Sequence, residues 1–236
     1  MKKYVDASDQ DNLIEIFPHI YLLRESIKLG PLLQMNRNMV IVREGHDLII
    51  INAVRLNQQN LEKLNQLGTV KHVIRLGDFH GLDDQFYIDT YQAEFWSQKQ
   101  HQTYPELIPN KIIDEKSIPP IKNSLFFIFK SAKYPEAVLL LNEHKLLVST
   151  DSIQYWNDWK HSSVLSRIIL WLMGFRLGLF IGGPWLKKVS PQKGGLKKDF
   201  ESLLKLDFTN LISAHGNVLK NTAKDDLRKI IDMTFR

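Results

Sequence analysis

The chain has 236 residues and no cysteine, and its 31 Lys and Arg residues against 26 Asp and Glu residues give a formal net charge of +5. The lack of cysteine excludes a disulfide framework, a Cys-ligated zinc module and a cysteine nucleophile. Hydrophobic residues make up 44% of the chain and charged residues 24%, which is ordinary for a globular protein. This length is ample for a sizeable core, so we expect a single domain over residues 1–236.

No apolar stretch follows the basic first three residues, so the sequence predicts no secretory signal and a cytoplasmic location. Residues 164–186 are strongly apolar, but Arg167 and Arg176 interrupt them, and the uncharged runs fall short of the roughly 18 residues of a membrane-spanning helix. Apolar residues at spacings of three and four predict a core helix over this segment, with a face made of Leu165, Ile168, Leu172, Phe175 and Leu179. The alternatives are a substrate lid, a homodimer seam or a membrane-surface contact.

The first half of the chain predicts short strands followed by a strand–helix–strand–helix unit. Three apolar runs read as strands, at 20–26, 39–44 and 47–54. A helix over 57–67, a strand over 69–76 and a helix over 83–98 follow. Because a helix connects them, the strands 47–54 and 69–76 should be parallel, with a right-handed crossover.

The second half predicts more strands covered by helices. A strand is expected over 124–130, then a hairpin of 137–141 and 145–150 around Asn142-Glu143-His144, then a strand over 208–214 and a closing helix. Residues 155–200 are the candidate for a helical insertion. Alternation of strands and helices indicates the α/β class, with sheets sandwiched between layers of helices.

Polar side chains follow the ends of several predicted strands, where they can converge above a sheet. These residues are Asp78, His80, Asp83 and Asp84 after the strand 69–76, Lys133 before the hairpin, Asp151 after it, and His215 after the strand 208–214. Two imidazoles and several carboxylates suit a mixed nitrogen and oxygen metal site. Purely structural roles are the alternatives: a helix N-cap for Asp83 or Asp84, an Asx-turn for Asp151, and loop hydrogen bonds for the two histidines.

Taken in order, these segments resemble the metallo-β-lactamase fold superfamily. The resemblance rests on the His/Asp loop at 77–84, a Pro-containing turn at 133–136, Ser-Thr-Asp at 149–151 and Ala-His-Gly at 214–216. It covers about residues 15–230 and implies a four-layer αββα sandwich of two mixed β-sheets. That family uses an HxHxDH loop, a later histidine in an HTPG-like turn, an aspartate at one strand end and a final histidine at another.

The first loop and the Pro-containing turn depart from the family pattern. Asp78 stands where the first histidine is expected, His80 keeps the second, and the DH pair falls on Leu82-Asp83 or on Asp83-Asp84. Lys133 replaces the later metal-binding histidine, and a protonated ammonium cannot ligate a metal. The resemblance therefore implies a degenerate motif with one divalent metal (Zn, Fe or Mn) or none. Its ligands would come from His80, Asp83, Asp84, Asp151 and His215, with Asp78 as a further ligand.

The sequence is compatible with two functions. The first is a metal-dependent hydrolase of a small molecule, in which Asp151 anchors the metal and Lys133 stabilises a developing oxyanion. The second is a non-catalytic binding or scaffolding module, which the missing histidines and the apolar 164–186 segment favour. A basic cluster could serve it as an anion patch, although few aromatic residues interleave it and nucleic acid is not the expected partner. The cluster consists of Lys187, Lys188, Lys193, Lys197 and Lys198.

Overall fold

The computed structural model describes Tyr4 and residues 7–28, Gly30, 32–99, 102–191 and 195–235. The first three residues and Lys193 therefore lie outside the described residues. The larger sheet has seven strands in the order β1-β2-β3-β4-β5-β6-β7. The first four strands pair antiparallel and β4 to β7 pair parallel, as predicted for β4 and β5. The bounds are β1 Ile14–Phe17, β2 Ile20–Lys28, β3 Gln34–Glu44, β4 Asp47–Ile51, β5 Thr69–Ile74, β6 Glu94–Ser97 and β7 Lys111–Ile112.

A second sheet of four strands has the order β13-β10-β9-β8. The predicted hairpin is present as an antiparallel pair of β9 and β10, joined by the short 3₁₀ turn Asn142–His144, and β10 runs parallel to β13. A separate two-stranded ribbon is made by β11 and β12. The bounds are β8 Ser124–Ile128, β9 Ala137–Leu141, β10 Leu146–Val148, β11 Ile153–Trp156, β12 Gly178–Ile181 and β13 Asn210–Ile212.

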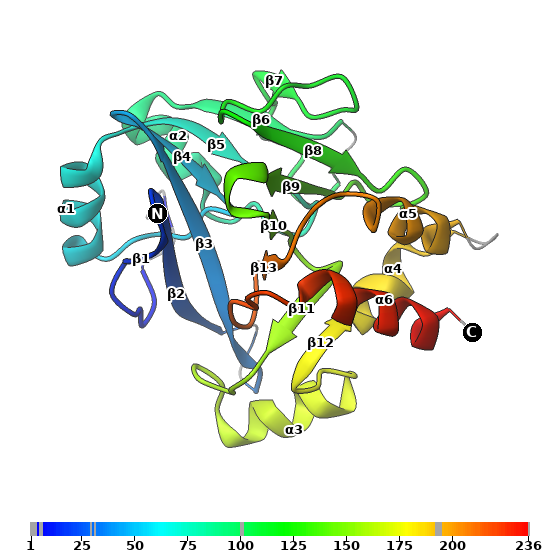
Figure 1. Cartoon of the computed structure of the whole chain (residues 1–236). Helices are drawn as coiled ribbons and strands as arrows, with labels where there is room; N and C mark the ends of the chain where they lie inside the picture. The colour runs from blue at the N-terminus through cyan, green and yellow to red at the C-terminus, as the bar shows by residue number, and fades with distance from the viewer. Residues whose placement is uncertain are drawn as a thin grey trace.

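The two sheets pack face to face and helices cover both outer surfaces (Figure 1). The side chains between the sheets include Val40 and Ile49 from the first sheet and Leu139 and Val148 from the second. Helices α1 (Gln58–Leu67) and α2 (Asp84–Tyr91) pack on the outer face of the first sheet. Helices α4 (Gly183–Val189), α5 (Leu196–Leu203) and α6 (Ala223–Thr234) cover the second. The expected four-layer αββα sandwich is thus confirmed.

The helix predicted over 83–98 is shorter than expected. It ends at Tyr91 because Gln92 adopts a left-handed backbone conformation with φ of 54°. The residues that follow form strand β6, which pairs in parallel with β5. Tyr87 and Tyr91, four residues apart in the helix, stack with ring centroids 6.2 Å apart, whereas Phe95 lies in the strand.

The prediction of one core helix over 164–186 is wrong. Helix α3 covers only Val164–Leu172, and the chain then reverses near Gly174, whose φ of 97° favours glycine. The next residues form strand β12, which pairs with β11, and α4 begins at Gly183. The expected core face divides accordingly: Phe175 and Leu179 are buried, whereas three residues of α3 are exposed, namely Leu165, Ile168 and Leu172.

Within the part of the chain that the structure describes, no helix combines the length and the apolar character needed to cross a membrane.

Candidate metal centre

Three side chains from separate strand ends meet at one edge of the sandwich. His80 lies in the loop after β5, Asp151 follows β10, and His215 follows β13. Because β10 and β13 are parallel, their carboxyl ends reach the same edge, and His80 approaches from the other sheet. His80 Nε2 lies 3.1 Å from Asp151 Oδ2, and His215 Nε2 lies 3.3 Å from Asp151 Oδ1. One ligand atom from each residue lies within 4.8 Å of the other two.

The orientation of His215 is fixed from behind by strand β3. Its Nδ1 donates a hydrogen bond to the Asn36 carbonyl at 2.7 Å, so this nitrogen carries a proton. The Asn36 side chain also accepts from Gly216 N at 2.9 Å, and Asn38 Nδ2 donates to Ser213 O at 2.8 Å. In neutral His215, the Nε2 lone pair therefore points towards the Asp151 carboxylate.

Two electron-rich atoms facing each other at this distance require a positive charge between them or on the imidazole. The pKa of Asp151 reflects this arrangement. Burial alone would raise the pKa, but the charge of His80 and the hydrogen bonds from both histidines outweigh burial and hold it far below its usual value. Asp151 is thus an anion over the whole neutral range and a strong electrostatic anchor for a cation.

A second carboxyl group lies behind Asp151. Glu136 is buried, and its Oε1 accepts a hydrogen bond from Ser152 N at 2.8 Å. Burial, reinforced by the negative charge of Asp151, raises the pKa of Glu136 to about 8. Glu136 therefore stays neutral around pH 7 and adds no second negative charge beside Asp151.

The donor set fits a divalent metal. Two imidazole nitrogens and one carboxylate oxygen are ligands that Zn, Fe and Mn accept, and three protein ligands leave further coordination positions open. The hydrogen bond from His215 Nδ1 to a carbonyl is the type of outer contact that orients metal-binding histidines.

Asp83 and Asp84 point elsewhere. Asp83 forms an ion pair with Arg37, which also contacts the buried Glu25. Asp84 Oδ2 accepts from Arg75 Nε at 2.6 Å, and both side chains are fully buried. The structure therefore does not bring either carboxylate into the group of His80, Asp151 and His215. Asp83 occupies the N-cap position of α2, yet its side chain makes no capping hydrogen bond.

Asp78 and Lys133 also lie outside this group. The Asp78 carboxylate accepts from Gln102 N and from Thr103 Oγ1, which fixes the segment leading to Tyr104. Lys133 is exposed and does not line the cavity at the site. The lysine that does line it is Lys188 on α4, whose Nζ lies 4.3 Å from the centre of the Phe79 ring.

The three side chains open into a cavity of about 380 Å³. The polar lining includes His80, Asp151 and His215 together with Arg37 and Lys188. Its other walls are largely apolar and come from the β2–β3 hairpin, from the α3 segment and from α4; they include Ile27, Leu33, Met35, Leu170, Met173, Phe175 and Trp185.

The sequence analysis did not predict roles for Asn36, Asn38 and Arg37. A signal was present, because Asn36 and Asn38 share the face of β3 that carries Val40 and Val42 between the sheets. Two amides on an otherwise apolar strand face indicate polar partners. Those partners, at 213–216, are some 180 positions away along the chain, as in the pair of Asn36 and Gly216.

No protein-family model matches the sequence, and no curated protein matches it. Solved structures do match. Among solved structures, VMB-1 superposes with a TM-score of 0.69 at 10% identity, over 97% of this chain and 99% of that chain. The DIM-1 metallo-β-lactamase gives 0.69 at 7% identity over 97% and 100%, and the mono-zinc form of FIM-1 from Pseudomonas aeruginosa gives 0.67 at 10% over 97% of each chain. The chain therefore has the metallo-β-lactamase fold, as predicted.

Proposed function

We propose that this chain is a metal-dependent hydrolase whose reduced site holds a single divalent metal, Zn, Fe or Mn, through His80, Asp151 and His215. The observation that carries the proposal is the convergence of these three donors from separate strand ends to within 4.8 Å. The fold supports it, since solved structures that superpose on this chain are metallo-β-lactamases, one of them described as a mono-zinc form.

The protein's own groups divide the work at this site. Asp151 supplies the negative charge, His80 and His215 supply neutral nitrogen ligands, and Asn36 keeps Nε2 of His215 directed at the site. A bound divalent metal supplies Lewis-acid chemistry, which polarises a substrate oxygen and lowers the pKa of water. Lys188 provides positive charge in the cavity, in the role that the sequence assigns to Lys133. The Arg37 guanidinium, which also lines the cavity, is already paired with Glu25 and Asp83.

The cavity favours a substrate with an apolar body. Much of the remaining lining is aliphatic or aromatic, and such walls stabilise a ligand by removing its apolar surface from water. Lys188, which lines the cavity, favours a negatively charged or strongly polar group on the substrate.

Metal content and thermal unfolding of the wild type and His215→Ala test this function. We expect one equivalent of metal in the wild type. If the free metal concentration is at least about 100 times the Kd, a chelator should lower the unfolding midpoint by roughly 5–10 °C. His215→Ala should hold little metal and respond little to chelation, because it loses one of three ligands. His46→Ala, at an exposed turn, is the matched control and should behave as the wild type.

Two outcomes would contradict the proposal. An unchanged wild-type midpoint on chelation, with no bound metal, would instead favour the non-catalytic binding module. Two equivalents of tightly bound metal would exclude the single-metal site.

A further inference from the structure

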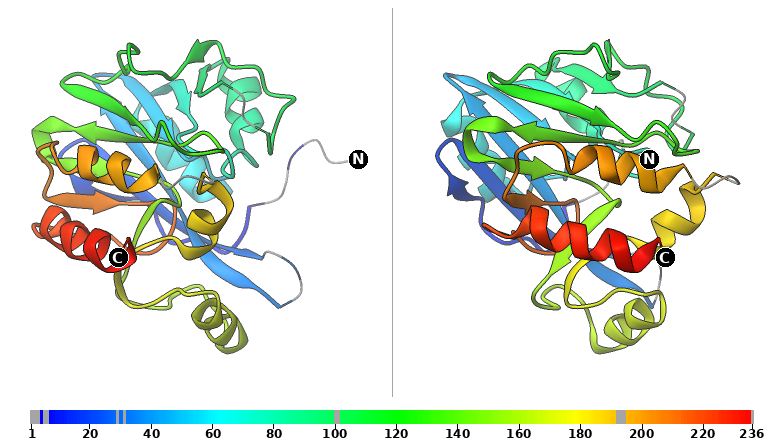
Figure 2. Two further views of the ribbon diagram at one scale, coloured as in Figure 1. Left: turned by 90° about the vertical axis from the view of Figure 1, so that its right-hand side faces the viewer. Right: turned by 45° about the vertical axis from the view of Figure 1, so that its right-hand side comes forward.

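Helix α3 presents an apolar face to the outside of the molecule. It lies apart from the helices that cover the sheets, next to the β11–β12 ribbon (Figures 1 and 2). Val164 and Leu172 are each 72% exposed, and Ile168 and Trp171 are each 55% exposed. Met173 and Leu177 extend the exposed apolar surface beyond the helix. Contiguous apolar surface of this kind is typical of an interaction site.

The helix is held firmly in this orientation. Its inner side is formed by Ser166 and Leu170, and Leu170 packs with Trp156, Phe175 and Met35. Ser166 Oγ accepts a hydrogen bond from Gln34 N at 2.8 Å, which ties the helix to the β2–β3 hairpin. One side of α3 is therefore packed against the protein, and the apolar side chains on its other side remain exposed.

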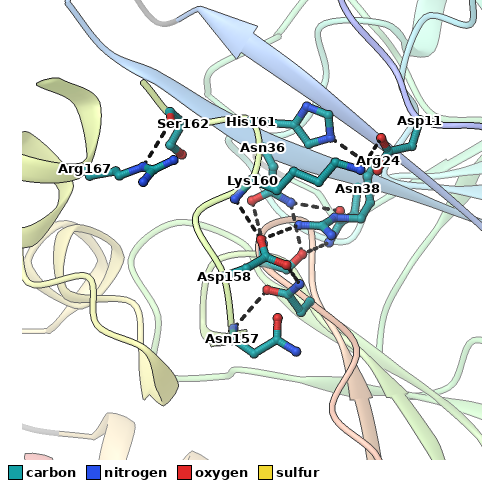
Figure 3. Close-up of polar contacts among 12 residues, drawn as sticks. Asp11, Arg24, Asn36, Asn38, Asn157, Asp158, Lys160, His161, Ser162 and Arg167 are labelled. Carbon is teal, nitrogen blue, oxygen red and sulfur yellow. Dashed lines mark hydrogen bonds and ion pairs between the residues drawn. The ribbon is translucent and has the colours of Figure 1, made fainter. Parts of the chain in front are cut away.

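A polar network fixes the segment that leads into α3 (Figure 3). Asp158 accepts hydrogen bonds from Asn217 at 2.7 Å and from Lys160 N at 2.8 Å, and it pairs with Arg24. Lys160 Nζ in turn pairs with Asp11 at 2.7 Å. These contacts join the base of α3 to β2, to the segment before β1 and to the loop after β13, so the exposed face has a defined position on the molecule.

The charged side chains of α3 and of the turn after it are basic: residues 164–177 include Arg167 and Arg176 and no Asp or Glu. Arg167 and Arg176 flank the apolar side chains, are exposed, and form no ion pair with any carboxylate of the described residues. The Arg176 guanidinium lies 4.6 Å from the centre of the Trp171 ring. A partner that covers this face must therefore offer both apolar and negatively charged surface.

We infer that α3 and the residues that follow it dock on the surface of an anionic lipid bilayer. Exposed Leu, Ile and Trp side chains can enter the boundary between headgroups and acyl chains while arginines remain at the headgroups. Each basic residue near such a surface adds attraction to anionic lipid. The helix has nine residues, so it lies on the bilayer and does not cross it.

A second copy of the chain fits the same face less well. A twofold contact places the same surface on both partners, and each would bring Arg167 and Arg176 against the other without a carboxylate to pair them. The docked orientation also has a consequence for the cavity: Leu170 and Met173 line it, so one of its walls would lie next to the lipid. The docking itself does not depend on the proposed hydrolase activity.

Flotation with lipid vesicles tests the inference. The full chain is mixed with vesicles of phosphatidylcholine alone or with 30% phosphatidylserine, at low and high salt. We expect binding to the anionic vesicles that weakens at high salt, because the Debye length falls from about 10 Å at 0.1 M to about 3 Å at 1 M. The variant with Ile168→Ser, Trp171→Ser and Leu172→Ser should bind at least about tenfold more weakly, since its apolar contribution is removed.

A matched triple variant with Ile108→Ser, Ile118→Ser and Met233→Ser removes exposed apolar side chains from other surfaces and should bind as the wild type. Unfolding midpoints verify that both variants fold. Equal binding of the wild type and the α3 variant, or equal binding to neutral and anionic vesicles, would overturn the inference. A lack of binding to any of the vesicles would also overturn it. In that case sedimentation velocity shows whether the chain is a monomer or a dimer that the α3 variant dissociates.

Discussion

The buried pair of Arg75 and Asp84 allows a structural role of Asp84 to be separated from metal binding. The Arg75 Nε to Asp84 Oδ2 distance is 2.6 Å, and the two side chains are 0% and 1% exposed. Asp84→Ala would leave the guanidinium buried without its counter-charge. Breaking a buried pair in this way costs about 3–5 kcal/mol of unfolding free energy. For a chain of this size, that corresponds to a midpoint lower by roughly 6–20 °C.

The assay is urea unfolding followed by tryptophan fluorescence, combined with elemental analysis of the folded protein. We expect Asp84→Ala to lose stability and to retain the metal content of the wild type. The double variant Arg75→Met with Asp84→Leu should recover much of the loss, because no unpaired charge remains. Normal stability together with lost metal in Asp84→Ala would refute this reasoning and would make Asp84 a ligand.

Two further predictions concern Glu136 and Gly182. Burial raises the pKa of Glu136 from 4.5 to about 8, so the folded state holds a proton that the unfolded state has lost. In chelator-treated protein, the contribution of Glu136 to the unfolding free energy should therefore be fully present below pH 4.5 and should be lost as the pH rises from 4.5 to about 8. Glu136→Gln should flatten this fall when the unfolding midpoint is measured against pH. An equally steep fall in both proteins would contradict the prediction. At Gly182, an added Cβ would lie 2.2 Å from the Asp151 carbonyl oxygen, whereas at Gly183 the nearest atom is 3.4 Å away. Gly182→Ala should thus reduce metal content and Gly183→Ala should not, and equal metal content in the two variants would show that Asp151 tolerates the displacement.

The sequence alone indicated the fold and the residues that converge in the candidate metal centre. Apolar runs of strand length, separated by turn residues, predict the alternation of strands and helices, because side-chain periodicity is a local property. Polar residues directly after such runs also stand out, which is how His80, Asp151 and His215 could be selected. The parallel pairing of β10 with β13 then brings two of them to the same edge of the sheet.

Tertiary structure decided which of the predicted acids lies beside the two histidines. Asp83, Asp84 and Asp151 look alike in the sequence, since each follows a strand or begins a helix. Arg37 of β3 pairs with Asp83, and Arg75, directly after β5, pairs with Asp84. The sequence pattern gives no sign of either pairing.

The faces of the helices were decided in the same way. The spacing of Leu165, Ile168 and Leu172 correctly marks one side of a helix, yet that side is exposed. Periodicity tells which residues share a face, whereas burial depends on what the rest of the chain packs against it. In this protein, Gly174 turns the chain back into the β11–β12 ribbon, and the ribbon and the β2–β3 hairpin contact the opposite side of α3.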